Sequence, residues 1–232
     1  MVTGPDPNFP ALGVTDYYFF PDPKEWDDNI IAVGGNLSPG MLLSAYEQGI
    51  FPWYGPEDPI IWQSPDPRCI IFPDKLHISA SMLKVYKNRI FQITFNRNFE
   101  GVIKGCAETP RAGQPIPTST WVSSDIISAY MELHNMGFAI SAEAWQDGEL
   151  VGGCYGVLMG KAFFGESMFA KKSNASKAAF LALAETLFQN GLAFIDCQVP
   201  SNHLQSLGGE VFSRKDFLEL LQIHKVSRFN IG

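Results

Sequence analysis

Two short stretches place acidic and amide side chains among apolar neighbours, and these residues are the first candidates for chemistry. Glu166 lies in the run LMGKAFFGESMF, and Asp196 and Gln198 lie in the run AFIDCQV. Residues of these types can accept a proton or orient a polar group, and a carboxylate among apolar side chains is costly unless something needs it. Glu143, which shares a strand face with Ser141, is interpreted instead as a solvated or structural acid.

The stretch around Glu166 predicts a β-hairpin. The Gly-Lys pair at 160–161 is a two-residue turn between apolar runs, and such a turn sets Tyr155 opposite Glu166. Alternation then places Glu166 on one face with Phe164 and Met168. The hairpin therefore carries a carboxylate inside an apolar and aromatic surface.

The run AFIDCQV belongs to a second strand, predicted at Leu192–Val199. Alternation puts Asp196 and Gln198 on one face, where they form either an acid–amide pair in a cleft or a buried structural pair. Alternation alone slightly favours the structural pair. Cys197 could act as a nucleophile with His203, but neighbouring residues on a strand point to opposite faces, which disfavours a site shared with Asp196.

Helices and a mostly antiparallel sheet are predicted to position these strands. Asp147-Gly148 is a type I′ turn signal that joins a preceding strand to the hairpin as a meander. Periodicity and capping residues predict helices over residues 39–49, 79–87, 99–106, 124–137, 174–190, 203–207 and 214–223, further strands at 69–72, 91–95, 138–145 and 211–212, and a loop at 108–120. The predicted fold class is α+β, with the sheet flanked by helices.

Proline-rich segments divide the chain. Residues 1–35 predict an irregular, partly ordered arm. The run WQSPDPR predicts a rigid turn and the boundary between a small N-terminal domain, residues 1–66, and a larger domain, residues 67–232. The apolar run Ile50–Tyr54 either fills an interdomain core or lines a pocket, and the core is favoured.

Composition narrows the class of protein. The sequence is 46% hydrophobic and 18% charged, which is typical of a globular protein. No apolar run reaches the roughly 18 residues that span a bilayer, and no secretory signal pattern is present. Four separated cysteines and four scattered histidines favour free thiols over disulfides or a metal site. We expect a cytoplasmic protein without a metal and without membrane contact.

The net charge of −7 is unevenly distributed along the chain. Residues 1–60 carry nine acidic residues and a single basic one, whereas residues 75–99 carry five basic residues and no acidic one. Segments of opposite sign are compatible with a polyanion bound on one side and a cation on another. A solvated basic helix and strand would fit the same pattern equally well.

Longer motifs carry a resemblance to a known family. The chain contains, in this order, AVGGNLSPGMLLSAYEQGIFPWY, IIWQSPDPR, TWVSSDIISAY, LVGGCYGV, FFGESMF, NASKAA, FIDCQV and HLQSLGG. These motifs span about four-fifths of the chain, from Ile31 to Leu221, and resemble the leucyl/phenylalanyl-tRNA–protein transferases. The resemblance implies a small N-terminal domain and a C-terminal domain like the acyl-CoA N-acyltransferase fold.

The resemblance also implies an activity. It is the transfer of leucine, phenylalanine or methionine from aminoacyl-tRNA to proteins that begin with Arg or Lys, which marks them for N-degron proteolysis. The catalytic residues it implies are Asp196, Gln198 and Glu166. The residues it implies for substrate binding are Trp53, Tyr46, Trp121, Tyr130, Phe163, Ile195 and Met168. Alternation puts Phe163 and Glu166 on opposite faces, so a shared site requires a twist or bulge near Gly165.

The implied reaction is aminolysis of an ester, which needs no cofactor or metal. An α-amine has a pKa of about 7.7–8.0 and must lose a proton before it attacks. Asp196 would accept that proton or orient the amine, and Gln198 would position the reacting groups. Glu166 would either bind the Arg or Lys side chain of the acceptor or orient its amine. The basic residues between 75 and 99 would contact tRNA phosphates.

Several positions depart from the family pattern, and two other functions are considered. Asn36 replaces an Asp, Ala80 and Gln48 replace arginines, and Cys154 replaces a pocket methionine. An N-acetyltransferase would need a glycine-rich pyrophosphate loop, which the run KKSN at 171–174 lacks. A catalytically silent tRNA- or N-terminus-binding module is disfavoured by the presence of both the Asp and the Gln of FIDCQV. We expect a monomer.

Overall fold

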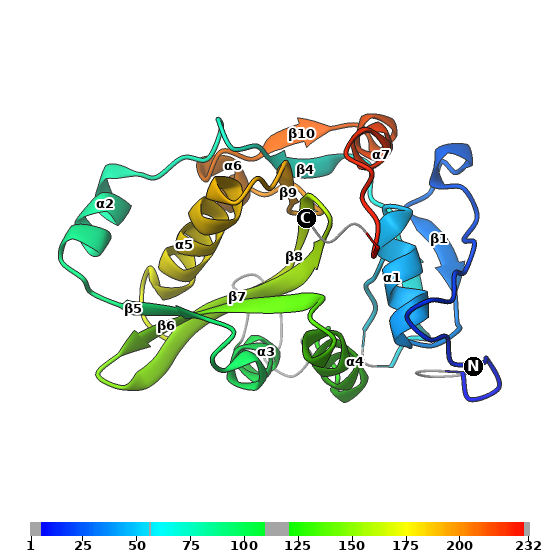
Figure 1. The fold of residues 1–232 in the computed structure, drawn as a ribbon, viewed down its shortest axis with the longest axis horizontal. Helices are drawn as coiled ribbons and strands as arrows, with labels where there is room; N and C mark the ends of the chain where they lie inside the picture. The colour runs from blue at the N-terminus through cyan, green and yellow to red at the C-terminus, as the bar shows by residue number, and fades with distance from the viewer. Residues whose placement is uncertain (1–5, 56, 110–120, 230–232) are drawn as a thin grey trace.

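The computed structural model describes residues 6–55, 57–109 and 121–229 (Figure 1). The helices are η1 Pro23–Glu25, α1 Pro39–Glu47, α2 Ala80–Lys87, α3 Phe99–Glu108, α4 Ser124–Asn135, α5 Ala175–Gln189, α6 Asn202–Ser206 and α7 Arg214–Ile223. The strands are β1 Ile30–Val33, β2 Phe51–Pro52, β3 Ile61–Gln63, β4 Arg68–Ile71, β5 Gln92–Phe95, β6 Ala139–Gln146, β7 Glu149–Met159, β8 Ala162–Ala170, β9 Phe194–Asp196 and β10 Glu210–Phe212. The expected α+β class is confirmed.

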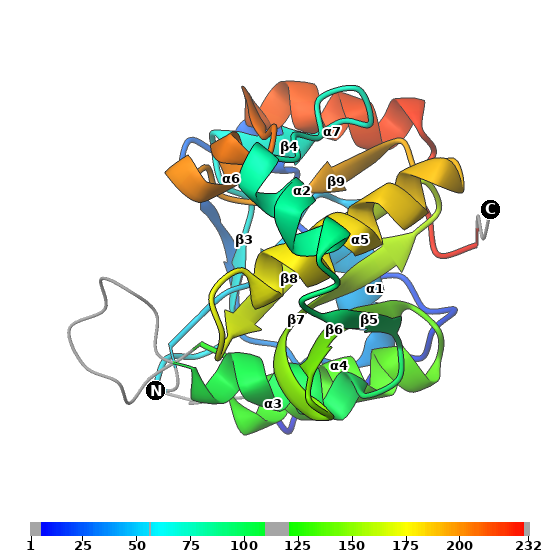
Figure 2. The same ribbon diagram turned by 90° about the vertical axis from the view of Figure 1, so that its left-hand side faces the viewer.

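The larger sheet has seven strands in the order β10-β4-β9-β8-β7-β6-β5. Strands β5 to β8 form the predicted antiparallel meander, and the turn between β6 and β7 has positive φ at both Asp147 and Gly148, as a type I′ turn requires. Strands β8 and β9 run parallel because α5 crosses from the end of one to the start of the other. Helices α2 and α5 cover one face of the sheet, and α3 and α4 cover the other (Figures 1 and 2).

A smaller sheet was not predicted. Strands β1, β3 and β2 pair in that order, all antiparallel. The expected irregular arm at residues 1–35 is therefore wrong for Ile30–Val33. Its strand is short, and its pairing with β3 is irregular between Ile30 and Ala32, so no clean alternation marks it in the sequence.

Helix α1 lies where the two sheets meet. All of its residues except Glu47 are buried, and it begins at Ser38-Pro39 as predicted. It shares one hydrophobic core with the small sheet, α3, α4 and α7, while α2 and α5 build a second core on the opposite face of the large sheet. The first core therefore crosses the predicted boundary between residues 66 and 67, which stays a prediction.

The hairpin of β7 and β8 has the predicted turn but not the predicted register throughout. Met159 pairs with Ala162, as the turn requires, and Gly156 pairs with Gly165. The expected pairing of Tyr155 with Glu166 is wrong, because Tyr155 pairs with Ser167 and the register shifts at this point. Glu166 is the extra residue of a β-bulge. The bulge expected near Gly165 is therefore present.

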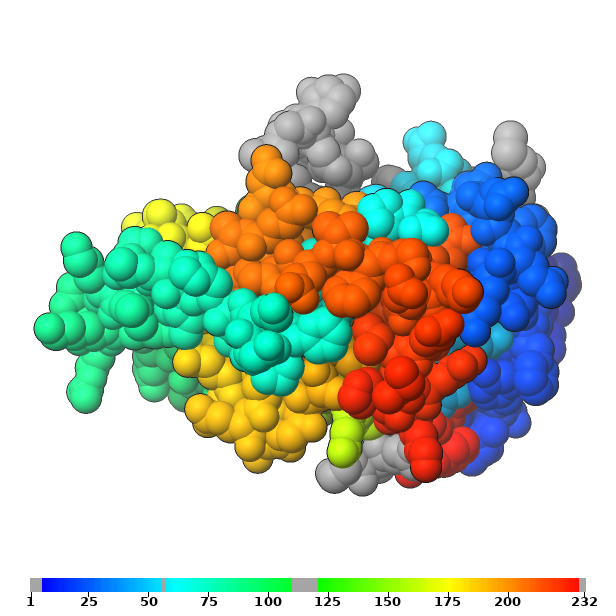
Figure 3. All heavy atoms as spheres, turned by 90° about the horizontal axis from the view of Figure 1, so that it is seen from above, coloured from blue at the N-terminus to red at the C-terminus, as the bar shows by residue number. Residues whose placement is uncertain are grey.

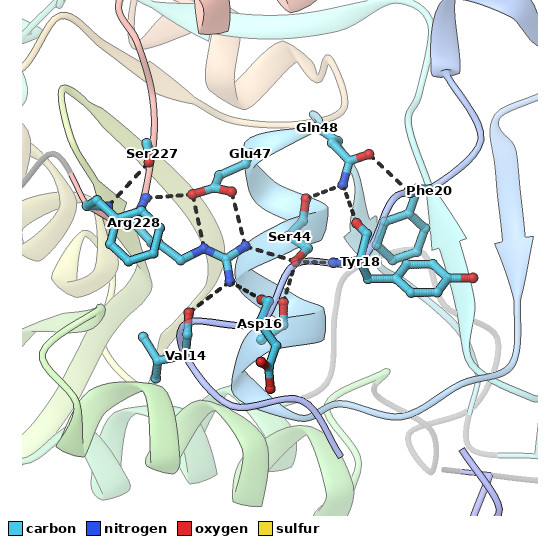
Figure 4. Close-up of polar contacts among 11 residues, drawn as sticks. Val14, Asp16, Tyr18, Phe20, Ser44, Glu47, Gln48, Ser227 and Arg228 are labelled. Carbon is cyan, nitrogen blue, oxygen red and sulfur yellow. Dashed lines mark hydrogen bonds and ion pairs between the residues drawn. The ribbon is translucent and has the colours of Figure 1, made fainter. Parts of the chain in front are cut away.

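Both ends of the described chain meet on α1. The Arg228 guanidinium donates to the carbonyls of Val14 and Asp16 at 3.0 and 2.7 Å and forms an ion pair with Glu47 at 3.0 Å (Figure 4). Figure 3 shows the C-terminal segment against the N-terminal one. No helix in the described residues is long and apolar enough to cross a membrane.

Gln48 holds the N-terminal segment to the same helix. Its Nε2 donates to the carbonyl of Tyr18 at 2.8 Å, and its Oε1 accepts from the backbone N–H of Phe20 at 3.1 Å (Figure 4). An amide can both donate and accept here, which a guanidinium cannot. The Gln48 side chain is thus used in the fold of this chain.

Candidate functional site

A cavity of about 770 Å³ opens where β8 and β9 separate. The two strands pair only between Ala162–Phe164 and Phe194–Asp196. Strand β8 continues to Ala170, whereas the chain beyond β9 turns away. The cavity lies between residues 165–170 on one side and residues 197–199 on the other, with part of α5 at its edge. The end of a parallel strand pair thus forms the opening.

Glu166 enters the cavity from the bulge and is 7% exposed. Its Oε1 accepts from the Tyr46 hydroxyl at 2.8 Å and from Gln198 Nε2 at 2.9 Å, and its Oε2 accepts from the Tyr130 hydroxyl at 3.2 Å. The two tyrosine hydroxyls also hydrogen-bond to each other. Three of the predicted site residues therefore converge on Glu166, from α1, α4 and the segment after β9.

The carboxyl of Glu166 titrates near neutral pH. Burial raises its pKa from 4.5 to about 7, the hydrogen bonds from Tyr46 and Tyr130 oppose that rise, and the charges of Asp196 and Arg68 act in opposite directions. Burial, followed by the charge of Glu166, raises the pKa of both tyrosines well above 10, so they stay protonated donors. The site can therefore take up or release a proton at Glu166 around pH 7.

Asp196 is fully buried and does not line the cavity. Arg68 forms a two-pronged ion pair with it, with Nε to Oδ1 at 2.9 Å and Nη2 to Oδ2 at 2.6 Å. Oδ1 also accepts the backbone N–H of Gln198 at 2.8 Å. Both carboxylate oxygens are thus engaged inside the protein.

Gln198 does not continue the strand. The predicted strand Leu192–Val199 is too long, since β9 ends at Asp196 and Gln198 has a φ of 63°. The Gln198 N–H donates to the side chain of Asp196, and the Gln198 carbonyl accepts the N–H of Cys69 on β4 at 3.0 Å, so the chain turns at Gln198 while it stays bound to β4. This turn brings the Gln198 amide to Glu166. Asp196 is therefore the structural member of the pair, and Gln198 the member in the cavity.

The predicted apolar pocket residues divide into two groups. Trp53, Trp121, Phe163 and Met168 line the cavity. Ile195 does not line it but packs in the core beneath α5. The expected shared face of Glu166 and Met168 is wrong, because the bulge shifts alternation by one and Met168 packs against the core that holds Phe163.

The run Ile50–Tyr54 serves both of its expected uses. Phe51 is 2% exposed and belongs to the core, yet its ring reaches the cavity wall, while Trp53 is 38% exposed and lines the cavity. The two rings stack with centroids 6.4 Å apart. This segment follows α1, so the N-terminal part of the chain contributes one wall of the site.

Sequence reasoning gave no role to several residues of the site. Arg68 lies in the quoted motif WQSPDPR, but only a partner 128 positions away reveals its role. The far wall of the cavity, formed by residues 197–204 and by α5, includes Phe180, which no motif indicated, and also Cys197 and His203, which the sequence alone disfavours as a nucleophile pair. The pKa of His203 is lowered by burial and by the charge of Lys177. No local pattern marks Arg68 or Phe180 as part of the site.

The basic stretch at residues 75–99 forms a surface around α2 at one end of the molecule (Figure 3). Lys84 and Lys87 lie in the last turn of α2, and the Arg97 guanidinium lies 6.0 Å from the Trp145 ring centroid. Lys75 is 3.4 Å from Glu210, and both side chains are partly exposed. Within the described ranges, no group of three or more His, Cys, Asp or Glu side chains could hold a metal ion.

Fold and cavity together define a class of protein. In an α+β fold, a mixed parallel and antiparallel sheet opens between two parallel strands into an apolar cavity. The cavity contains the carboxyl of Glu166, which titrates near pH 7, and the side-chain amide of Gln198. Such a site is suited to a group transfer in which an apolar group is held beside a polar reacting centre.

Comparisons with known proteins identify the family. The model of the leucyl/phenylalanyl-tRNA protein transferase family matches residues 70–222, and the model of its N-terminal domain matches residues 35–66. The chain therefore belongs to the leucyl/phenylalanyl-tRNA–protein transferase family and is a transferase. The transferase of this name from Syntrophobacter fumaroxidans is 47% identical over 213 residues, 91% of this chain and 90% of that protein. The one from Flavobacterium johnsoniae is 48% identical over 205 residues, 88% and 95% of the two chains.

Solved structures show a weaker likeness. L-PGS from Bacillus licheniformis covers 59% of this chain and 48% of its own at 16% identity, with a TM-score of 0.42. A GCN5-related N-acetyltransferase from Kribbella flavida covers 76% and 62% at 11% identity, with a TM-score of 0.40. Likenesses at this level carry no argument about activity.

Proposed function

We propose that this chain transfers leucine, phenylalanine or methionine from aminoacyl-tRNA to the N-terminal α-amine of proteins that begin with Arg or Lys, and so marks them for N-degron proteolysis. The observation that carries the proposal is the cavity of about 770 Å³, in which apolar walls meet Glu166 and Gln198. The curated relatives are named for the two substrates of this reaction. We propose that it works in the cytoplasm, as a monomer and without a cofactor.

The apolar walls fit the side chain of the transferred amino acid. Trp53, Trp121, Phe163 and Met168 present rings and a thioether, and Cys154 is a small residue in the same wall. An aliphatic or aromatic side chain leaves water on entering such a chamber, whereas a charged one would lose its hydration without a partner. This favours Leu, Phe and Met over polar amino acids.

The transfer replaces one bond by another. The neutral α-amine of the acceptor attacks the ester carbonyl, an amide C–N bond forms, and the ester C–O bond to the terminal ribose breaks. The ribose oxygen leaves with a proton, and the attacking nitrogen loses one. No net oxidation occurs, and no external energy source is needed because the ester is already activated.

Glu166 and Gln198 are the groups that can touch the reacting atoms. Glu166, with a pKa of about 7, can accept a proton from the α-ammonium, whose own pKa is about 7.7–8.0. In its ionised form it can also hold the acceptor's cationic side chain. Gln198 can hydrogen-bond to the ester oxygen as charge develops on it. Asp196 acts as an orienting group, because Arg68 and the Gln198 N–H occupy its oxygens.

The basic surface around α2 is the proposed contact for tRNA phosphates. Lys84, Lys87 and Arg89 lie on it in an otherwise acidic protein. Binding of aminoacyl-tRNA should weaken with added salt, because each neutralised phosphate releases counterions. Replacing Lys84 and Lys87 by Gln should reduce the slope of log affinity against log salt by about one for each charge removed.

The proposed function is tested by incubating the protein with radiolabelled Leu-, Phe- or Met-tRNA and peptides that begin with Arg, Lys or Ala. Label is expected to move to the Arg and Lys peptides and not to the Ala peptide. A matched reaction with charged tRNA for a polar amino acid, such as Ser-tRNA, should give no product. Absence of label in every peptide would overturn the proposal.

A further inference from the structure

Arg68 is a fully buried cation that contacts two aromatic rings. Its side chain is 1% exposed, and its Cζ lies 5.0 Å from the ring centroid of Phe51 and 4.3 Å from that of Phe217. The planar guanidinium therefore has little freedom to tilt. A cation held this rigidly can fix the orientation of any group that binds it.

Arg68 binds two segments that meet at the cavity. Its Nε and Nη2 hold Asp196 at the end of β9, and its Nη1 donates to the carbonyl of Gly49, just after α1, at 3.3 Å. The first contact is the two-pronged geometry that a guanidinium forms with a carboxylate. The second contact ties the same side chain to the helix that carries Tyr46.

These contacts close a ring of hydrogen bonds through the site. From Arg68 the ring passes to Asp196, whose Oδ1 accepts the Gln198 N–H, and from the Gln198 side chain to Glu166. Tyr46 of α1 donates to Glu166, and α1 leads back to the Gly49 carbonyl that Arg68 holds. Within this ring, Arg68 is linked to Glu166 through Asp196 and Gln198 on one side and through Gly49 and Tyr46 of α1 on the other.

We propose that Arg68 is a positioning residue for the transfer reaction: by fixing the Asp196 carboxylate, it maintains the left-handed turn at Gln198 and so aims the Gln198 amide at Glu166. The inference rests on the proposed function. A φ of 63° is rare for a residue other than glycine, and at Gln198 it accompanies the hydrogen bond to Asp196 Oδ1. Without the two-pronged anchor, the carboxylate can rotate and the Gln198 segment can relax toward an extended strand.

A purely structural role would give Arg68 a different signature. In that case Arg68 only neutralises a buried carboxylate, and its loss would lower the stability of the whole protein independently of Gln198. The proposed positioning role acts through Asp196 and Gln198, and Lys at position 68 keeps the charge near Glu166. The two are separated by a double-mutant cycle, because effects that share one route are not additive.

The cycle compares wild type, Arg68→Lys, Gln198→Ala and the double variant in transfer from Phe-tRNA to an Arg peptide. Lysine keeps the charge but cannot form the two-pronged pair. Arg68→Lys is expected to lower kcat about tenfold or more and to change KM for either substrate less than about threefold. In the Gln198→Ala background, the same change should cost less than about twofold.

Arg228→Lys is the matched control. Arg228 is also a buried guanidinium paired with a carboxylate and two carbonyls, but it does not line the cavity (Figure 4). It is expected to lower the melting temperature, leave kcat at 25 °C within about twofold of wild type, and combine additively with Gln198→Ala. If Arg68→Lys does not fold, the neutral pair Arg68→Met with Asp196→Asn takes its place in the cycle, and its effect on kcat is likewise expected to be less than about twofold in the Gln198→Ala background.

A measurement that does not depend on transfer activity tests the positioning role of Arg68 separately from the proposed function. In the NMR spectrum, the side-chain amide signals of Gln198 should shift on Arg68→Lys and stay in place on Arg228→Lys. A wild-type protein that transfers nothing would overturn the proposed function, and unmoved Gln198 signals would overturn the positioning role. The positioning role would also be overturned if Arg68→Lys lowered kcat by the same factor in the Gln198→Ala background as in wild type. A wild-type kcat in Arg68→Lys itself would overturn it too.

Discussion

Replacing Glu166 by Gln should make the protein more stable and less active, with a stability gain that depends on pH. Glu166 is 7% exposed, and burial raises its pKa from 4.5 to about 7. The folded state therefore retains a proton on this carboxyl over a range where the unfolded state has already lost it. A neutral glutamine removes that difference between the two states.

The size of the effect follows from the pKa rise. Between pH 4.5 and about 7, the unfolded chain binds fewer protons than the folded one, so wild-type stability from this group falls as pH rises. At about 1.4 kcal/mol per pH unit, the rise from 4.5 to about 7 amounts to about 3 kcal/mol. Below pH 4.5 both states are protonated and the contribution of this group is fully present. Above pH 7 the loss is complete and constant.

The assay is equilibrium unfolding in urea at pH 5, 6, 7 and 8 for wild type and Glu166→Gln. The variant's advantage in unfolding free energy should grow by about 1.4 kcal/mol per pH unit up to about pH 7 and then level off. Glu149→Gln, at the exposed start of β7, is the matched control and should change stability by less than about 0.5 kcal/mol at each pH. A difference between Glu166→Gln and wild type that does not vary with pH would refute the reasoning. Transfer by Glu166→Gln should fall at least about 100-fold, because the amide can neither take a proton nor hold a cation.

Three further changes test the surroundings of Glu166. Tyr46→Phe removes a hydrogen-bond donor that lowers the pKa of Glu166, so the pH at which transfer reaches half its maximum should rise. The control Tyr86→Phe on α2 should leave this pH unchanged. An unmoved midpoint in Tyr46→Phe would contradict the role of Glu166 as proton acceptor. Gly156→Ala places a Cβ 2.1 Å from the carbonyl oxygen of Phe164 and should lower the unfolding free energy by about 2 kcal/mol or more. In Gly165→Ala the atom nearest to the new Cβ is 3.5 Å away, so the same denaturation experiment should show a loss of less than about 1 kcal/mol. Cys154→Phe fills part of the cavity and should lower kcat/KM for Phe-tRNA at least about tenfold, and more than for Leu-tRNA; equal losses for both would show that this wall does not contact the transferred side chain.

Local patterns predicted those parts of the fold that depend on neighbouring residues. The turn at 160–161, the Asp147-Gly148 turn and helix α7 appear where their residues indicate them. Each is set by turn chemistry or by capping within a few positions. The small N-terminal sheet was missed because its strands are two to four residues long and owe their pairing to contacts between distant segments.

The candidate site could be predicted only in part. The family motifs pointed to Glu166, Gln198 and the aromatic wall, and the structure brings Tyr46, Tyr130 and Gln198 together on Glu166. Alternation could not predict that β9 stops at Asp196, because the turn at Gln198 depends on a side-chain hydrogen bond. The partner of Asp196 lies 128 positions away in the sequence, so no spacing rule reveals it.

Two carboxylates buried in the same sheet show why burial alone does not identify a functional acid. Glu143 is fully buried, and it accepts from the hydroxyls of Ser141 and Thr94 within its own strand pair. Its donors lie on β5 and β6 and in the segment that follows β5, and it faces no part of the cavity, as expected of a structural acid.

Glu166 differs in the origin of its partners. Its donors come from α1, α4 and the turn after β9, and a bulge breaks the ladder to expose it to the cavity. A carboxylate that served stability alone could sit in the regular strand and take its hydrogen bonds from near neighbours. The bulge at Glu166 and the left-handed turn at Gln198 both interrupt regular strand geometry, and the raised pKa of Glu166 reflects the cost of burying its charge. All three features occur at one point of the fold. From that convergence we propose Glu166 as the centre of the site, a role in which the same substitution should increase stability and remove activity.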